Sequence, residues 1–172
     1  MWSSSRRTFA KVGLAALVAI SAGGCVEPLY GSLGAGVLEQ ELQAIKVEQI
    51  PDRFGHYVAQ ELIFALNGSG AVVQPKYRLV VALKQRVQSP VVDTVTSRAT
   101  AASLVADADF GLYPVAGGPA VIQGVAFSVA SYDRFSQRIS NVRAARDAEI
   151  RDAKAIAEQI RNQITSRLAA RH

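Results

Sequence analysis

Residues 77–88, YRLVVALKQRVQ, alternate between apolar and polar side chains over most of their length. A period of two is typical of a β-strand that covers a core with one face only. Pro90 follows shortly after. Because proline cannot donate to a sheet ladder, either the strand ends there or the sheet has an edge at that point. The stretch predicts a strand, and the fold depends on what pairs with it.

Two more strands follow along the chain. From Thr100 to Leu112 the even-numbered positions are the more apolar ones. Gly117-Gly118-Pro119 predicts a turn. A third strand then runs towards Tyr132, with Val121, Val125, Phe127 and Val129 as its apolar positions. Three consecutive strands with short loops predict an antiparallel meander with one covered face.

Helical periods lie on either side of this meander. Residues 44–50 alternate as a short strand that Pro51 ends, and Asp52 is the expected N-cap of a helix running to about Asn67. A long helix is predicted from about Ser140 to Ala170. Its apolar stripe is Ile150, Ala153, Ala157, Ile160, Ile164 and Leu168. The predicted fold is α+β, with two helices on one face of a roughly four-stranded, mostly antiparallel sheet, in the order strand-helix-strand-strand-strand-helix.

The N-terminus has the layout of an export signal. Arg6, Arg7 and Lys11 precede a short apolar run, and small residues then lead to Cys25, the only cysteine. Ala22-Gly23-Gly24-Cys25 resembles a bacterial lipobox, which implies cleavage before Cys25 and acylation of its thiol, for example with palmitate. The alternative is a plain signal peptide followed by a chance cysteine. We expect a signal peptide over 1–24, a lipidated tether over 25–43 and a single domain over 44–172.

Two further features concern export and charge. Ser5–Lys11 resembles a twin-arginine export motif, and the alternative is an ordinary positive n-region. The chain has a net charge of +5, of which the three basic residues of the signal supply three, so residues 25–172 carry +2. This nearly neutral charge does not suggest a nucleic-acid partner.

Few residues suit catalysis. His56 lies within the predicted first helix and His172 is the last residue, and neither has an evident orienting partner. Asp107 and Asp109 share a strand face and could chelate a hard cation, but a solvated face explains them more simply. We therefore expect no enzyme, no cofactor and no metal site.

The basic side chains are more suggestive. Arg78, Lys84 and Arg86 project from one predicted strand, and Arg98 precedes the next. Guanidinium and ammonium groups could meet the phosphates of an anionic lipid head group. Alternatively, these charges keep an exposed strand soluble and protect an edge from aggregation.

Several short motifs, in order, resemble one family. Residues 24–31, GCVEPLYG, are similar to the opening of the LPS-assembly lipoprotein LptE family in its alphaproteobacterial form. Ile50–Gly55 with Val58 and Leu62 resembles that family's passage into its first helix, and Pro75–Val81 resembles its following strand. Ser131–Asp133 and, further on, Asp147, Ala148, Ala157 and Ile160 resemble the family's approach to its last helix and that helix. Val26-Glu27 and Ala59-Gln60 depart from the family pattern.

The resemblance implies a non-catalytic role at the outer membrane. Family members sit as a plug inside the β-barrel LptD, support its assembly, and bind lipopolysaccharide for insertion into the outer leaflet. Lipid A phosphates would suit Arg78, Lys84, Arg86 and Arg98. Val26 follows Cys25 where many inner-membrane lipoproteins have aspartate, which favours the outer membrane. The alternative is another outer-membrane or transport-accessory lipoprotein that acts as a protein-interaction module.

Overall fold

The computed structural model describes residues 35–68, 70, 72–92 and 99–171, and the residues from Gly36 onward form one compact unit. Its elements are α2 (Ala35–Gln43), β1 (Ile45–Val47), α3 (Asp52–Leu66), β2 (Tyr77–Val92), β3 (Ala99–Pro114), β4 (Ile122–Asp133) and α4 (Arg138–Ala169). The predicted fold class and element order are confirmed. One helix, α2, precedes the predicted elements.

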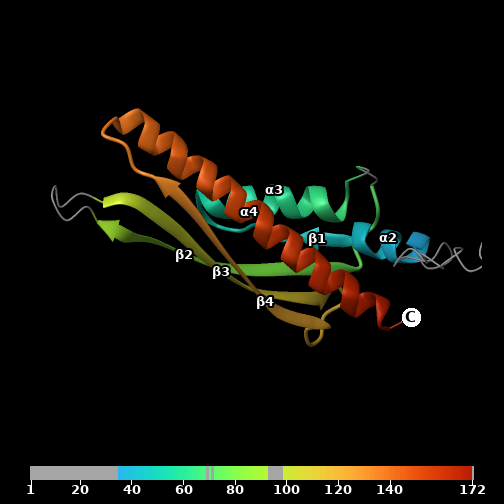
Figure 1. Ribbon diagram of the computed structural model, residues 1–172. Helices are drawn as coiled ribbons and strands as arrows, with labels where there is room; N and C mark the ends of the chain where they lie inside the picture. The colour runs from blue at the N-terminus through green and yellow to red at the C-terminus, as the bar shows by residue number, and fades with distance from the viewer. Residues whose placement is uncertain (1–34, 69, 71, 93–98, 172) are drawn as a thin grey trace, which may run out of the picture. The chain divides into compact units, whose positions relative to one another are not determined.

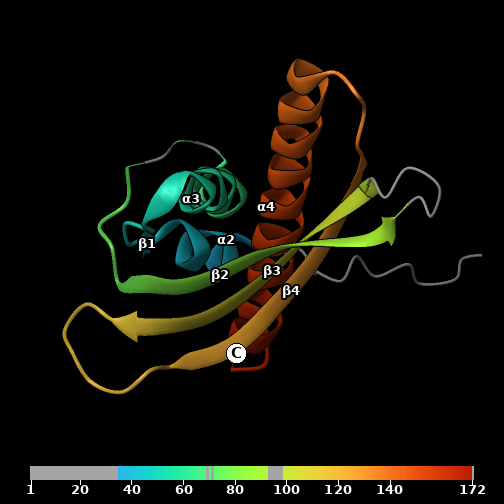
Figure 2. The same cartoon turned by 90° about the vertical axis from the view of Figure 1, so that its left-hand side faces the viewer.

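The four strands form one sheet in the order β1-β2-β3-β4 (Figure 2). β2, β3 and β4 are the predicted antiparallel meander, and β1 joins β2 in parallel. β1 pairs only with Tyr77–Leu79, so β2 lies at an edge of the described sheet beyond that point. β2 continues past Pro90 with an irregular register between Gln88 and Val91. Of the two expectations for Pro90, the sheet edge is the one observed, as proline requires.

α3 and α4 lie on the same side of the sheet (Figures 1 and 2). We call this side the covered face and the opposite side the outer face. Small residues of β4 permit α4 to come close, because a Cβ on Gly124 would lie only 2.5 Å from Gln163 Oε1 and 2.7 Å from Phe110 Cζ. The core includes Val58, Leu62, Leu79, Leu112, Ile156, Ile160, Ile164 and Leu168.

The stretch expected to be tether differs in part from the expectation. Residues 35–43 form α2, whose Leu38 and Leu42 are 7% and 6% exposed and join the core. A nine-residue helix is too short to be stable alone, so its packing stabilises it. The preceding residues 25–34, Cys25 among them, lie outside the described residues.

Two local expectations for the helices are wrong. Asp52 does not cap α3. Pro51 holds the N-cap position without a side-chain hydrogen bond, and Asp52 is the first helical residue, with a φ of 70°. Ile150 is 42% exposed, because Glu149 and Asp152 take part in the covered side of α4. In the part of the chain that the structure describes, no helix is long and apolar enough to cross a bilayer.

α4 also covers the free edge of β4 with hydrogen bonds. Gln159 Nε2 donates to Phe127 O (2.9 Å), and Gln159 Oε1 accepts from Phe127 N (3.2 Å). Three more side chains of α4 donate to backbone carbonyls of β4: Arg151 to Ser131 (3.1 Å), Gln163 to Val125 (2.8 Å) and Arg167 to Gln123 (2.7 Å). Arg171, which follows α4, donates to the carbonyl of Val121, just before β4 (2.8 Å).

These bonds follow from a match between two repeats. A four-residue step along a helix rises about 6 Å, and a two-residue step along a strand rises about 6.6 Å. Every fourth residue of α4 therefore meets every second residue of β4. The one step without a described bond is Val129, since the helix has Ala155 at the matching position. This edge of the sheet is closed to another strand.

Candidate functional site

The outer face carries the basic residues singled out in the sequence. Arg78, Lys84 and Arg86 all project from β2 to this face and are exposed, and we call them the basic row. Val80 and Ala82 separate Arg78 from Lys84 on this face, while Leu79, Val81 and Leu83 point to the covered face. Arg98 lies outside the described residues. The structure therefore places three of the four expected lipopolysaccharide-binding residues on one face of one strand, with Lys84 and Arg86 adjacent and Arg78 about 20 Å away along the strand.

Carboxylates of the neighbouring strand partly balance the basic row. Arg86 Nη1 lies 2.7 Å from Asp107 Oδ2, and the two side chains are 55% and 32% exposed. Lys84 stands directly opposite Asp107 in the register. Exposed pairs of this kind contribute at most about 1 kcal/mol to stability. An anionic ligand could therefore compete with Asp107 for these two cations at low energetic cost.

Arg78 is held differently, by an aromatic ring. Its guanidinium carbon lies 5.1 Å from the centroid of the Tyr113 ring, a cation–π contact. The Tyr113 ring lies over Gly111, where a Cβ would be only 2.8 Å from Tyr113 Cε2. Gly111 thus makes room for the ring that positions Arg78.

A shallow hollow of about 520 Å³ lies beside this stack. Its lining is mainly apolar and includes Val80, Ala82, Tyr113 and Val125. Gly111 contributes to it, since it has no side chain to fill the space on this face. The hollow could receive a flat or flexible apolar group next to Arg78.

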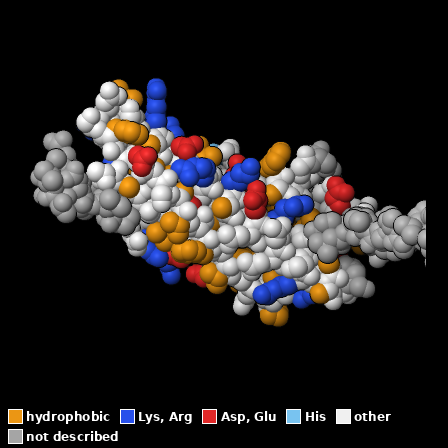
Figure 3. All heavy atoms as spheres, viewed as in Figure 1, with side chains coloured by type: hydrophobic (Ala, Val, Ile, Leu, Met, Phe, Trp, Pro, Cys, Tyr) orange, Lys and Arg blue, Asp and Glu red, His pale blue; other side chains and the backbone are white. Residues whose placement is uncertain are grey.

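β4 adds an apolar stripe to the outer face. Val125, Phe127 and Val129 are 60%, 50% and 48% exposed. The sequence predicted these apolar positions on the face of the meander that the long helix covers. That expectation is wrong, because the structure turns them outward while Ala126 and Ala130 face α4. Hydrophobic side chains gather below α4 in Figure 3, beside basic and acidic ones. The outer face therefore combines cations on β2 with apolar side chains on β4.

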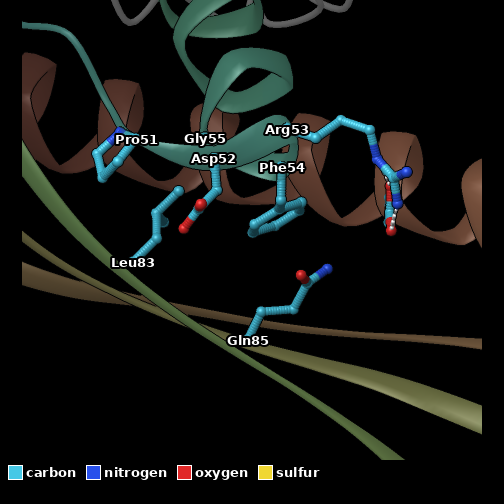
Figure 4. A pocket seen from close by; sticks show the side chains of 8 residues that line it. Pro51, Asp52, Arg53, Phe54, Gly55, Leu83 and Gln85 are labelled. Carbon is cyan, nitrogen blue, oxygen red and sulfur yellow. Dashed lines mark hydrogen bonds and ion pairs between the residues drawn. The ribbon is translucent and has the colours of Figure 1, made fainter.

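A second hollow, a cleft of about 310 Å³, lies where α3 begins, between β2 and α4. Figure 4 shows Phe54, Leu83 and Gln85 around it, with Pro51 and Asp52 at one side. Gly55 packs closely against Ile50, just before α3, since a Cβ on Gly55 would be 2.7 Å from Ile50 Cγ2. We call this hollow the α3 cleft.

An ion pair closes the far side of the α3 cleft. Arg53 Nη2 and Nε donate to the two carboxylate oxygens of Glu149 at 2.6 and 3.1 Å. The hydrogen bond and the charge of Glu149 raise the pKa of Arg53. Glu149 is only 9% exposed, so the pair joins the start of α3 to a buried acid of α4. Sequence reasoning missed this pair, because nothing in the spacing of residues 96 apart signals contact.

The structure also contains a buried acid that the sequence did not single out. Asp152 is 1% exposed and accepts a hydrogen bond from Ser128 Oγ at 2.5 Å, while its other carboxylate oxygen has no partner among the described residues. Burial raises the pKa of Asp152, and the hydrogen bond from Ser128 opposes this rise. This acid lies between α4 and β4, away from both hollows.

The remaining candidate residues are placed as follows. His56 is exposed on α3, with its ring centroid 6.4 Å from that of Tyr57. Asp107 and Asp109 both face the outer side. The described residues contain no group of three or more His, Cys, Asp or Glu side chains that could hold a metal ion. Cys25 and His172 lie outside the described residues.

Comparison with known proteins gives structural relatives only. No protein-family model matches the chain, and no curated protein matches it. The fold is similar to that of a protein of Caulobacter crescentus CB15 assigned as a lipoprotein, with 21% identity, a TM-score of 0.65, and coverage of 78% of this chain and 97% of that one. It is also similar to a minor lipoprotein of Acinetobacter baumannii, with 16% identity, a TM-score of 0.53, and coverage of 71% and 88%.

A third structure is more distant. The rare lipoprotein B of Shewanella oneidensis has 13% identity, a TM-score of 0.46, and coverage of 74% and 97%, and no conclusion rests on it. The first two likenesses establish the fold: this chain has the α+β fold of two bacterial lipoproteins.

Proposed function

We propose that this chain is a lipid-anchored outer-membrane lipoprotein of the lipopolysaccharide-assembly machinery, and that it acts as plug and assembly partner of an LptD-type β-barrel. The observation that carries the proposal is the fold itself, which this chain shares with two lipoproteins. A lipobox-like Cys25 and the ordered LptE-like motifs support it. Two or more acyl chains would give a stable membrane anchor.

Binding of lipopolysaccharide is the second part of the proposal. The basic row offers three cations for lipid A phosphates, and charge-assisted bonds to phosphate are among the stronger polar contacts in proteins. The apolar stripe of Val125, Phe127 and Val129 lies two strands away, about 10 Å at the usual strand spacing. An amphiphile with phosphates and acyl chains matches this arrangement.

A copurification experiment tests the assembly role. Tagged protein extracted in mild detergent should copurify with a large β-barrel of the LptD type, identified by mass spectrometry. A variant with Cys25→Ala, secreted through a cleavable signal without lipid, is the control for anchoring. Copurification with inner-membrane transporter subunits alone would refute the proposal.

The competing function is a lipoprotein that binds only protein partners. The exposed apolar stripe on β4 favours this protein-binding function, because contiguous apolar side chains on a solvent-exposed face often mark protein interfaces. Direct titration with lipopolysaccharide separates the two functions. Barrel copurification without any lipopolysaccharide binding would favour the protein-interaction module.

A further inference from the structure

The two edges of the sheet differ in whether their outward backbone groups have hydrogen-bond partners. At the β4 edge, five side chains hydrogen-bond the outward backbone groups. At the β2 edge, β1 pairs only with Tyr77–Leu79, while β2 itself continues to Val92. The segment Leu83–Val87 of β2, which we call the open edge, has no described strand beside it.

Backbone groups of the open edge point away from the sheet in a regular pattern. Leu79 O accepts a hydrogen bond from Glu48 N at 2.9 Å, on the β1 side of β2. Alternate residues of an antiparallel strand bond the same neighbour. Leu83, Gln85 and Val87 therefore direct their N–H and C=O groups to the same side as Leu79. Among the described residues none of these groups has a hydrogen-bond partner on that side.

The side chains around the open edge set the chemistry of a strand added there. On the covered face, Leu83 and Gln85 line the α3 cleft with Phe54 (Figure 4), and Val87 is 56% exposed although it points to this face. An added strand would place every second side chain over this region, and an apolar side chain would bury Val87 and Leu83. On the outer face the same strand would meet Lys84 and Arg86.

Charge decides between two kinds of occupant. A second copy of the chain, pairing edge to edge, would bring its own Lys84 and Arg86 beside these two cations, and like charges on neighbouring strands destabilise pairing. β2 has no acidic residue to relieve this repulsion. An added strand with acidic side chains on the outer face is instead favoured. Its carboxylates would pair with Lys84, which has no ion pair among the described residues.

We propose that the open edge binds an extended segment of another protein as an added β-strand, and that this segment alternates apolar with acidic residues. Its backbone bonds Leu83, Gln85 and Val87, its apolar side chains face the α3 cleft, and its acidic side chains face Lys84 and Arg86. This is the strand-addition mode of peptide recognition. The proposal does not depend on lipopolysaccharide binding or on the identity of the barrel.

Hydrogen exchange on the full chain in detergent tests it. The probe is a synthetic peptide of about eight alternating valine and glutamate residues at about 1 mM, and the control peptide has lysine in place of glutamate. We expect the acidic peptide to slow exchange at the amides of Leu83, Gln85 and Val87. The amides of Lys84 and Arg86 already bond β3 and should not change. No slowing at the three amides, or equal slowing by the lysine peptide, would overturn the proposal.

Two matched proline variants locate the site. Gln85→Pro removes one outward N–H and leaves the β2–β3 ladder intact, since its N–H points away from β3. Gln123→Pro makes the same change at the closed β4 edge. We expect Gln85→Pro to weaken binding of the acidic peptide at least about tenfold and Gln123→Pro to leave it unchanged. Equal loss in both variants, or concentration-dependent self-association protecting the same amides without peptide, would contradict the assignment.

Because Gln85→Pro changes no charge, its result is independent of lipopolysaccharide binding. Circular dichroism of both variants establishes that each is folded. If Gln85→Pro is unfolded, Lys84→Glu is used in its place. This variant should bind the lysine peptide more tightly than the glutamate peptide, the reverse of the native chain. An unchanged preference would overturn the proposal.

Discussion

The side-chain amide of Gln159 brackets the backbone of Phe127, accepting from its N–H at 3.2 Å and donating to its C=O at 2.9 Å. One helical residue thus replaces the neighbouring strand that Phe127 lacks. Single donations to carbonyls along β4 recur at four-residue steps of α4, except at Ala155, so the long helix both covers the sheet and closes its β4 edge. The first prediction concerns this closure.

Replacement of Gln159 by leucine should weaken the fold and expose the β4 edge. Both bonds to Phe127 are lost, and a hydrogen bond contributes about 1 kcal/mol net. We expect a loss of about 1–2 kcal/mol in the free energy of unfolding, measured by urea denaturation, and increased self-association, measured by light scattering. Asn162→Leu, on an exposed position of the same helix, is the control and should change neither quantity by more than a few tenths. Equal effects of the two variants would show that the bracket contributes nothing.

A second prediction concerns the ion pair between Arg53 and Glu149. Arg53→Ala leaves the carboxylate of Glu149, 9% exposed, without its partner. An unsatisfied buried group costs about 1–3 kcal/mol, so the variant should unfold at lower urea. Arg53→Ala combined with Glu149→Gln should recover part of the loss, because the buried charge is then absent.

The exposed pair of Asp147 and Arg151, at 2.9 Å, provides the comparison. Asp147→Ala should cost no more than about 0.5 kcal/mol, since exposed helical pairs contribute little. The decisive quantity for Arg53 and Glu149 is the interaction free energy from a double-mutant cycle of Arg53→Ala and Glu149→Gln. If the losses in the free energy of unfolding from these two substitutions simply add, Arg53 and Glu149 do not interact.

The third prediction uses the buried carboxyl of Asp152. Burial raises its pKa in the folded protein above the ordinary value of about 3.9. The folded state therefore favours the protonated form. The stabilising effect of that form is complete below about pH 4 and is lost as the pH rises through the folded-state pKa.

Asp152→Asn should therefore be more stable than the native chain at pH 7, by about 1 kcal/mol, because a neutral amide can still accept the bond from Ser128. The difference should shrink towards pH 3.5, where both side chains are neutral. Urea unfolding at the two pH values measures it, with Asp147→Asn as an exposed control. A native chain that is the more stable one at pH 7 would contradict the assigned direction.

The fourth prediction concerns the basic row. Charge reversal at Lys84 and Arg86 should weaken lipopolysaccharide binding at least about tenfold, because two cations of the outer face become anions. Association with the barrel should be unchanged. Lys154→Glu, on an exposed position of α4, is the control for a general charge effect, because it makes half of the same change in net charge away from the basic row. Unchanged binding in a direct assay would remove Lys84 and Arg86 from the site.

The period of the strands and the helices determined the fold class. Alternation over residues 77–88 and 100–112, followed by a helical stripe to Leu168, leaves few arrangements except helices on one face of a meander. These patterns depend only on which positions are apolar. The same reasoning could not place α2, since Leu38 and Leu42 are too few to define a period.

The face of β4 was decided by tertiary packing. Val125, Phe127 and Val129 are its larger apolar residues, and hydrophobicity alone would favour burying them. The structure buries Ala126 and Ala130 instead, because α4 runs so close to β4 that only small side chains fit between them. The contact of Gln163 and Phe110 with Gly124 shows how little space remains.

The sequence by itself determined the period of each element, the order of the elements and the grouping of Arg78, Lys84 and Arg86 on one side of a strand. Tertiary structure decided which edge of the sheet is closed, which acids are buried and how Arg53 meets Glu149. The physical reason is the range of the interactions. Periodicity reflects neighbours within a turn or a strand, whereas edge closure and buried ion pairs join residues that only the folded chain brings together.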